Sequence, residues 1–364
     1  MHKLYHMDYI IKFMQLLLDD NFTFYGATIK LLLSGKFSQT KNVQLWIYNE
    51  SDEMNEKYLT YFNISNKTDN KWKLDKSEWK IELENEYALS IKFIEEDKLY
   101  KYNKYGITLN KNGLKHKSDI KSLLKTLNEI ISKIKPKKKP KSKLRDLHIE
   151  WVDYLINNDC QVYGGFLLRY IIDDDLNRDI DVIYENDETK NMFQILIKSD
   201  IATKINNDKL KIVTPHGDII IDYHKKCSND EYLDVNGDAF CNILKLSSEG
   251  LDIRDIPENM TYVETFIKVF EDINKRQYTL MKEFPEKIKN NGDVRLFVKP
   301  YFMEKDGFIV NYDYLIKNNY TKTLFDFYVN STEVCQKCKE NNKKNFIVDD
   351  KIHCMKCMIE LYQK

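Results

Sequence analysis

Two aspartates separated by one residue are the first groups in this chain that could do chemistry. Asp179 and Asp181 lie in the apolar stretch 179–184, which is predicted to be a strand. Because side chains alternate between the two faces of a strand, both carboxylates point the same way. Like charges on one face need solvent or a bridging cation, and carboxylate oxygens are typical ligands of Mg²⁺. The pair predicts a magnesium site, with two solvated surface acids as the alternative.

A third carboxylate lies on a later apolar run, residues 219–222. Asp222 ends this run, and Asp218 has the same strand parity, so either could converge on the pair. We favour Asp222, because it lies deeper in the apolar run. Three carboxylates can hold two Mg²⁺ ions, one activating an attacking hydroxyl and the other steadying a leaving pyrophosphate.

A glycine pair precedes the acidic strand. Gly164 and Gly165 are followed by an apolar, helix-like stretch over 166–172. Glycines at the start of a helix let backbone N–H groups approach a phosphate, helped by the helix dipole. We therefore expect this pair to cradle the β- and γ-phosphates of a nucleotide, with a simple turn as the alternative.

The order of these features resembles the pattern of the DNA polymerase β-type nucleotidyltransferase superfamily. That pattern is a glycine pair, a helix, Asp-x-Asp and a distant third aspartate; here thirteen residues separate Gly165 from Asp179. The resemblance implies an α+β fold with a mixed sheet and flanking helices. It also implies transfer of a nucleoside monophosphate from a nucleoside triphosphate, and ATP is the expected donor. The metal ion would be Mg²⁺ or Mn²⁺, held by Asp179, Asp181 and Asp222.

Residues 238–242 extend the resemblance. Asp238 and Asn242 match the Asp-x-x-x-Asn segment of CCA-adding enzymes and bacterial poly(A) polymerases, in which this segment helps to hold the sugar of the incoming nucleotide. The family's arginine soon after the glycine pair is displaced, so Arg169 or Arg178 is expected to contact the triphosphate instead. The alternative is that Asp238 and Asn242 only stabilise a turn and cap a helix.

A weak internal repeat runs through the chain at an offset of about 130–138 residues. Residues 24–27 match 162–165, and residues 109–114 match 246–251. The first copy has Asn42 and Gln44 at the Asp-x-Asp positions and Lys92 at that of Asp222. Because amides and a lysine cannot bind two Mg²⁺ ions, this copy is expected to be degenerate. Paired active and degenerate domains resemble the poly(A) polymerases of large DNA viruses; chance matching in a Lys/Asn/Ile-rich sequence is the alternative.

Four cysteines near the end of the chain form two Cys-x-x-Cys pairs fifteen residues apart: Cys335, Cys338, Cys354 and Cys357. This spacing predicts a structural zinc site in a ribbon-like module, with strand, turn and strand over 346–352. Two redox pairs are the alternative. The total of seven cysteines is odd and small, which argues against a disulfide scaffold and favours a reducing compartment.

The charges balance, with 57 Lys+Arg against 57 Asp+Glu. This excludes a globally basic protein but not a local basic patch. The lysine-rich segment at 133–145 is such a patch, and it reads either as a solvated hinge or as a contact to phosphates of nucleic acid. The apolar runs are far shorter than the roughly 20 residues needed to cross a bilayer, so we expect a soluble protein of the cytoplasm (of the host, if viral) and no membrane partner.

The chain is therefore predicted to contain a degenerate nucleotidyltransferase-like domain (1–132), a basic linker (133–145), a catalytic domain (146–260), a helical segment (261–330) and a zinc module (331–364). The expected activity is template-independent addition of nucleotides to an RNA 3′ end, as in a poly(A) polymerase. One alternative is nucleotidyl transfer to a protein or small molecule. The other is that the chain is a non-catalytic scaffold that binds nucleic acid or protein.

Overall fold

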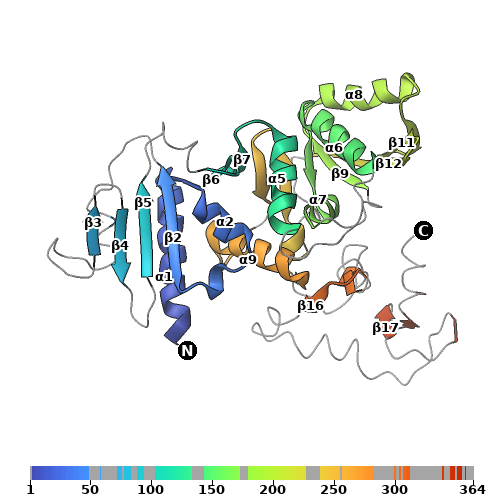
Figure 1. Ribbon diagram of the computed structural model, residues 1–364. Helices are drawn as coiled ribbons and strands as arrows, with labels where there is room; N and C mark the ends of the chain where they lie inside the picture. Colours follow the sequence, from blue (N-terminus) through green and yellow to red (C-terminus); the bar gives the residue numbers. More distant parts are fainter. Residues whose placement is uncertain are drawn as a thin grey trace. The chain divides into compact units, whose positions relative to one another are not determined.

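The computed structural model divides the chain into two compact units (Figure 1). Unit 1 consists of Met1–Leu233 and Asn242–Asn274, and unit 2 of Asp234–Cys241 and Lys275–Lys364. The structure describes residues 2–48, 58, 72–75, 78–82, 88–93, 103–132, 143–172, 179–226, 238–254, 256–281, 299–300, 303–304, 306–311, 338–339, 345–348, 351–354 and 357.

The strands described in unit 1 form one 14-stranded sheet in the order β10-β11-β12-β9-β8-β13-β14-β7-β6-β1-β2-β5-β4-β3. The first half of this sheet contains β1 (Thr23–Tyr25), β2 (Asn42–Tyr48), β3 (Trp72–Asp75), β4 (Glu78–Glu82), β5 (Ala88–Phe93), β6 (Ile107–Asn110) and β7 (Gly113–His116). The second half contains β8 (Gln161–Tyr163), β9 (Ile180–Tyr184), β10 (Thr203–Asn206), β11 (Lys209–Thr214), β12 (Gly217–Lys225), β13 (Leu244–Ser247) and β14 (Gly250–Ile253).

The two halves have the same strand order when each is read from its outer edge to the middle of the sheet. β10-β11-β12-β9-β8-β13-β14 corresponds to β3-β4-β5-β2-β1-β6-β7. One strand pair of this sheet is parallel in each half, β9 with β12 and β2 with β5. The sheet is therefore mixed, and the segments that match in the sequence repeat occupy corresponding strands.

The halves join where β14 pairs antiparallel with β7, with Leu251 opposite Leu114. The turn glycine of each hairpin lies against the other half. A Cβ atom on Gly113 would come within 2.5 Å of the Leu251 carbonyl oxygen, and one on Gly250 would collide with the Leu114 carbonyl oxygen. Both glycines have positive φ, 101° and 124°, which side-chain-bearing residues rarely adopt. The close join thus depends on glycine at both positions.

Seven helices are described in unit 1: α1 (His2–Asp19), α2 (Ala27–Leu33), α5 (Ile120–Ser132), α6 (Lys143–Ile156), α7 (Gly165–Ile171), α8 (Asp187–Lys198) and α9 (Tyr262–Lys275). The helix that follows each half of the sheet packs on the other half. On α5, the Asn128 amide donates to the carbonyls of Tyr170 and Ile171 at the end of α7, at 3.1 Å each. On α9, the Asn274 amide donates to the Leu33 carbonyl at the end of α2, at 2.8 Å.

Two expected boundaries differ from the structure. The linker was expected to extend to residue 145, but α6 begins at Lys143. The segment 261–330 was expected to be helical, yet after α9 it contains the parallel pair β15 (Gln277–Thr279) and β16 (Ile309–Asn311). Short strands of three residues carry too little periodicity to be read from sequence.

Unit 2 also contains the antiparallel hairpin of β17 (Asn345–Val348) and β18 (Lys351–Cys354), at the place where strand, turn and strand were expected. Within the described part of the chain, no helix is both long and apolar enough to cross a membrane.

Candidate functional site

The acidic residues of the second half meet on neighbouring strands. β9 and β12 run parallel, with Asp181 directly opposite Asp222, and β11 continues the row with Lys209 directly opposite Asp222. Residues directly opposite each other in a sheet project from the same face. The order of strands therefore places one lysine and two aspartates side by side on one face, although they lie up to 41 positions apart in the sequence.

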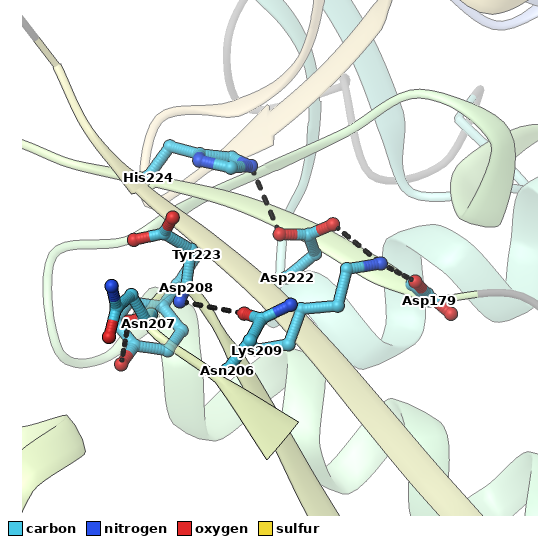
Figure 2. A network of polar contacts seen from close by, with 8 residues as sticks. All are labelled: Asp179, Asn206, Asn207, Asp208, Lys209, Asp222, Tyr223 and His224. Carbon is cyan, nitrogen blue, oxygen red and sulfur yellow. Dashed lines mark hydrogen bonds and ion pairs between the residues drawn. The ribbon is translucent and has the colours of Figure 1, made fainter. Parts of the chain in front are cut away.

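The Lys209 ammonium bridges two of the carboxylates (Figure 2). Its Nζ lies 2.5 Å from Asp179 Oδ2 and 2.9 Å from Asp222 Oδ2. Two carboxylates that reach the same nitrogen atom are close enough to share a small cation. Asp179 stands immediately before β9, so it reaches this point from the start of the strand.

His224 holds the other oxygen of Asp222, with 3.0 Å between its Nε2 and Oδ1 (Figure 2). Burial alone would raise the pKa of the Asp222 carboxyl, but hydrogen bonds from His224 and Lys209 lower it below its usual value. The hydrogen bond to Asp222 in turn raises the pKa of His224. Asp222 is thus ionised and fixed in orientation, with its side chain only 16% exposed.

Gly164 lies against the same site. Its φ is 78°, and a Cβ atom there would lie 3.2 Å from Asp181 Oδ2 and 3.9 Å from Asn242 Oδ1. Asn242 is buried, and its Oδ1 atom has no hydrogen-bond partner among the described residues. A buried acceptor without a partner is unfavourable, and a ligand with a donor group would satisfy it. Nothing described lies within 4 Å of a Cβ placed on Gly165.

The donor set fits a hard divalent cation. The site brings together the carboxylates of Asp179, Asp181 and Asp222, and Mg²⁺ binds oxygen. Among the described residues, however, no three His, Cys, Asp or Glu side chains are grouped closely enough to hold a metal ion. The Lys209 ammonium lies where the carboxylates would share that ion, so binding would require this side chain to move.

The other expected site residues that the structure describes lie on β12, on α7 and in unit 2. Asp218 pairs with Lys211 at 2.5 Å and precedes the part of β12 that pairs with β9, so it does not reach Asp181. Arg169 is buried near the end of α7. Asp238 belongs to unit 2, where it forms an ion pair with Lys299. Arg178 lies outside the described residues.

Lys209 and His224 were not expected from the sequence. His224 has the same strand parity as Asp222, which is a signal that could have found it. Lys209 carries no such signal, because its position opposite Asp222 depends on the pairing of β11 with β12.

The first half has different residues at the corresponding positions. Phe24 and Val162 both stand two residues before a glycine, and they pair with Ile47 and Val182 respectively. Trp46 therefore corresponds to Asp181, and Gln44 to Asp179. The expected assignment of Asn42 and Gln44 was two residues out of register, because Ile47 lies 21 positions after Gly26 whereas Val182 lies only 18 positions after Gly164.

Lys92 corresponds to Asp222, as expected, since it pairs with Trp46 as Asp222 pairs with Asp181. The Lys92 ammonium lies 5.5 Å from the centroid of the Trp46 ring, a cation–π contact. An indole and an ammonium group cannot coordinate Mg²⁺.

One cysteine from each Cys-x-x-Cys pair is described with its side chain, and these two are in contact. Cys357 is buried, and Cys338 packs against it. Cys335 lies outside the described residues, and for Cys354 only the backbone on β18 is described. The four-cysteine ligand set therefore stays a prediction.

No protein-family model and no curated protein matches this chain. Among solved structures it is similar to the Thermotoga maritima CCA-adding enzyme complexed with tRNA, with 14% identity over 54% of this chain and 45% of that chain, and a TM-score of 0.33. It is also similar to complexes of a CCA-adding enzyme with CTP (15% identity, 52% and 45% covered, TM-score 0.31) and with ATP (12%, 53% and 46%, TM-score 0.32).

This chain thus spans less than half the length of those chains. TM-scores of this size do not establish a shared fold, so the function has to be inferred from the site itself.

Proposed function

We propose that the second half of unit 1 is a Mg²⁺-dependent nucleotidyltransferase that adds nucleoside monophosphates to an RNA 3′ end without a template, in the manner of a poly(A) polymerase. ATP is the proposed donor and pyrophosphate the leaving group. The main support is that Asp181 and Asp222 lie side by side on parallel strands while Asp179 reaches the same ammonium group as Asp222.

Each acidic residue has a proposed role. Asp179 and Asp181 would hold both metal ions, and Asp222 would hold the ion next to the RNA hydroxyl. When bound, Mg²⁺ or Mn²⁺ supplies charge that favours the attacking oxygen and the leaving pyrophosphate. His224 keeps Asp222 oriented through their 3.0 Å contact. Asn242 offers its buried oxygen to the incoming nucleotide, and Gly164 leaves room beside Asp181 for the phosphates.

The remaining candidates have proposed roles in nucleotide binding. Gly165 would contribute its backbone N–H to the phosphates, and Arg169 or Arg178 would balance the charge of the triphosphate. Asp238 would serve the sugar, as the matching segment does in CCA-adding enzymes. These roles rest on the sequence resemblance alone.

The first half is proposed to be a degenerate copy of the same fold. Its strands follow the same order, and Trp46 and Lys92 occupy the positions of two metal ligands. Such tandem pairing would match the architecture of poly(A) polymerases of large DNA viruses. The first half would then support its neighbour or contact RNA.

Activity assays on two matched variants test this function. Asp222→Asn should lower nucleotide incorporation by more than about a hundredfold, because even changes next to metal ligands cost roughly 10–100-fold. Asp218→Asn, on the same strand and also ion-paired with a lysine of β11, should stay near wild type. The assay supplies an RNA primer, Mg²⁺ or Mn²⁺ and one nucleotide at a time, and sizes the products.

Labelled ATP offered with protein or small-molecule acceptors separates the alternative enzymes from RNA extension. Equal incorporation by wild type and Asp222→Asn would refute the assigned site. RNA binding with no detectable binding of metal and nucleotide would instead indicate a non-catalytic scaffold.

The cysteine pairs are proposed to hold one structural Zn²⁺, since Cys338, which precedes β17, and Cys357, which follows β18, are in contact. Purified protein should contain about one zinc per chain, measured by elemental analysis, because four thiolates complete a tetrahedral site. Cys335→Ser should lose it, whereas Cys160→Ser, a buried cysteine of unit 1, should keep it. Wild-type protein without zinc would rule out the site.

A further inference from the structure

We propose that Lys209 is an internal counter-ion that occupies the metal position of the second half and is displaced when the divalent cation binds, so that it lowers the affinity of the site for metal. This inference rests on the proposed function, because it takes the aspartates to be metal ligands. It assigns a role to a residue that does not belong to the Asp-x-Asp pattern.

Geometry supports competition between the ammonium and a metal ion. Lys209 Nζ lies within 3 Å of one oxygen from Asp179 and one from Asp222 (Figure 2). A divalent cation held by these two carboxylates would be attracted by the same negative charges that hold the ammonium, and the two cations would repel each other. The ammonium therefore competes with the metal for this site.

The position of Lys209 is set by the sheet rather than by a flexible loop. It begins β11 and pairs directly with Asp222, which pairs directly with Asp181. The backbone thus holds the base of the side chain beside the carboxylates, and only the flexible four-carbon stem has to move.

The first half shows that these two positions carry charge as a pair. There Lys92 corresponds to Asp222, and its register partner on β4 is Glu78, which occupies the position of Lys209. Both charges are reversed together. Both halves therefore have one lysine and one acidic residue at this pair of positions, in opposite order.

Displacement of Lys209 would leave the site ordered. The Lys209 side chain is 31% exposed, so its ammonium has access to water. Asp222 would keep its contact with His224, which uses the other carboxylate oxygen. The ligand would therefore stay in place while the counter-ion leaves.

Mn²⁺ binding to the full chain, followed by electron paramagnetic resonance of the free ion, tests this role. Lys209→Met should bind Mn²⁺ about tenfold more tightly than wild type, because a competing half-exposed ion pair is removed. Lys209→Arg, which keeps the charge, should bind no more tightly than wild type.

Lys211→Met is the matched control. Lys211 lies two residues further along β11 and pairs at 2.5 Å with Asp218 of the same neighbouring strand, away from Asp181. Its loss should change the Mn²⁺ dissociation constant by less than about twofold, as expected for an exposed pair outside the site.

Thermal unfolding adds a second measurement. Without metal, Lys209→Met should unfold at a lower temperature than wild type, and Mn²⁺ should raise its midpoint by more than it raises that of wild type. A lysine that only stabilised the sheet would lower the midpoint without strengthening metal binding.

The outcomes separate this inference from the proposed function. If wild type binds Mn²⁺ and Lys209→Met binds it equally or more weakly, the counter-ion role is refuted while the metal site stands. If neither protein binds Mn²⁺, the metal site and the counter-ion role both fall. Tighter binding by Lys209→Met than by Lys211→Met supports the role.

Discussion

Burial affects one histidine that packs against the helix after the glycine pair. His148 on α6 is 1% exposed, and its ring stacks on Phe166, the residue that follows the glycine pair, with 5.6 Å between ring centroids. Burial lowers the pKa of His148, and the nearby Arg145 charge lowers it further. Its Nδ1 contacts the Leu144 carbonyl at 2.8 Å, so the neutral ring donates there.

The free energy of unfolding should therefore fall as the pH drops below about 6.5, the ordinary value for histidine. The folded protein keeps His148 neutral while the unfolded chain takes up a proton, so acid favours unfolding, with a slope of at most about 1.4 kcal/mol per pH unit. Denaturant titrations from pH 7.5 to 5.0 would measure this, and His148→Gln should flatten the curve.

His216→Gln, at an exposed turn between β11 and β12, is the control for replacing a histidine by glutamine away from Phe166. Identical curves for wild type and His148→Gln would contradict the assignment.

Some residues of the candidate site could be predicted from the sequence and others could not. The parity of Asp179, Asp181 and Asp222 could be read from alternating apolar strands, and these positions do lie near one another. Lys209 could not be found, because its strand was not anticipated and its partner depends on the pairing of β11 with β12. Asp238 belongs to the other unit, so its role at the nucleotide stays a prediction.

The β13–β14 hairpin depends on the glycine at its turn. Gly250 has φ of 124°, and a Cβ atom there would collide with the Leu114 carbonyl oxygen of β7. Gly250→Ala should therefore lower the free energy of unfolding by about 2 kcal/mol or more, from backbone strain plus steric overlap.

Thermal and denaturant unfolding would measure the effect of Gly250→Ala. Gly165→Ala is the control, because no described atom lies within 4 Å of its added Cβ and the residue begins a helix. It should be neutral or slightly stabilising. A Gly250→Ala protein as stable as wild type would show that the strands separate easily at this turn.

Much of the element order could be predicted from the repeat. Matching segments at 109–114 and 246–251 form corresponding hairpins, β6–β7 and β13–β14. The pairing of the two hairpins into one sheet could not be predicted, because the local sequence pattern does not indicate that Leu114 pairs with Leu251. The register of Trp46 was missed for a related reason, since spacing along the chain does not reveal which residues of β2 and β9 pair with β1 and β8.

The two halves of unit 1 depend on each other through exchanged helices. Asn128 of α5 completes hydrogen bonds at the end of α7, and Asn274 of α9 does so at the end of α2. Glu271 of α9 also accepts hydrogen bonds from Ser38 of the first half. Each half therefore receives hydrogen bonds from the helix that follows the other half.

A chain limited to residues 143–274 should consequently lose cooperative unfolding, because β14 would become an open edge and α7 would lose its contact with α5. Circular dichroism during heating would show a broad, gradual change. Adding the separately produced fragment 2–132 should restore a sharp transition. A sharp transition at the wild-type midpoint without that fragment would show that the half folds alone.

The join between β7 and β14 has one more consequence. Leu114 faces Leu251, and each turn glycine faces the opposite strand, so both sides of the join present the same surface in the manner of an isologous interface. A homodimer of seven-stranded subunits would form the same contact about a two-fold axis. In a homodimer every substitution occurs twice, so a change at the proposed metal site alters both copies. In a single chain the two copies can differ, and the first has Trp46 and Lys92 at the positions of Asp181 and Asp222 while the shared edge is kept.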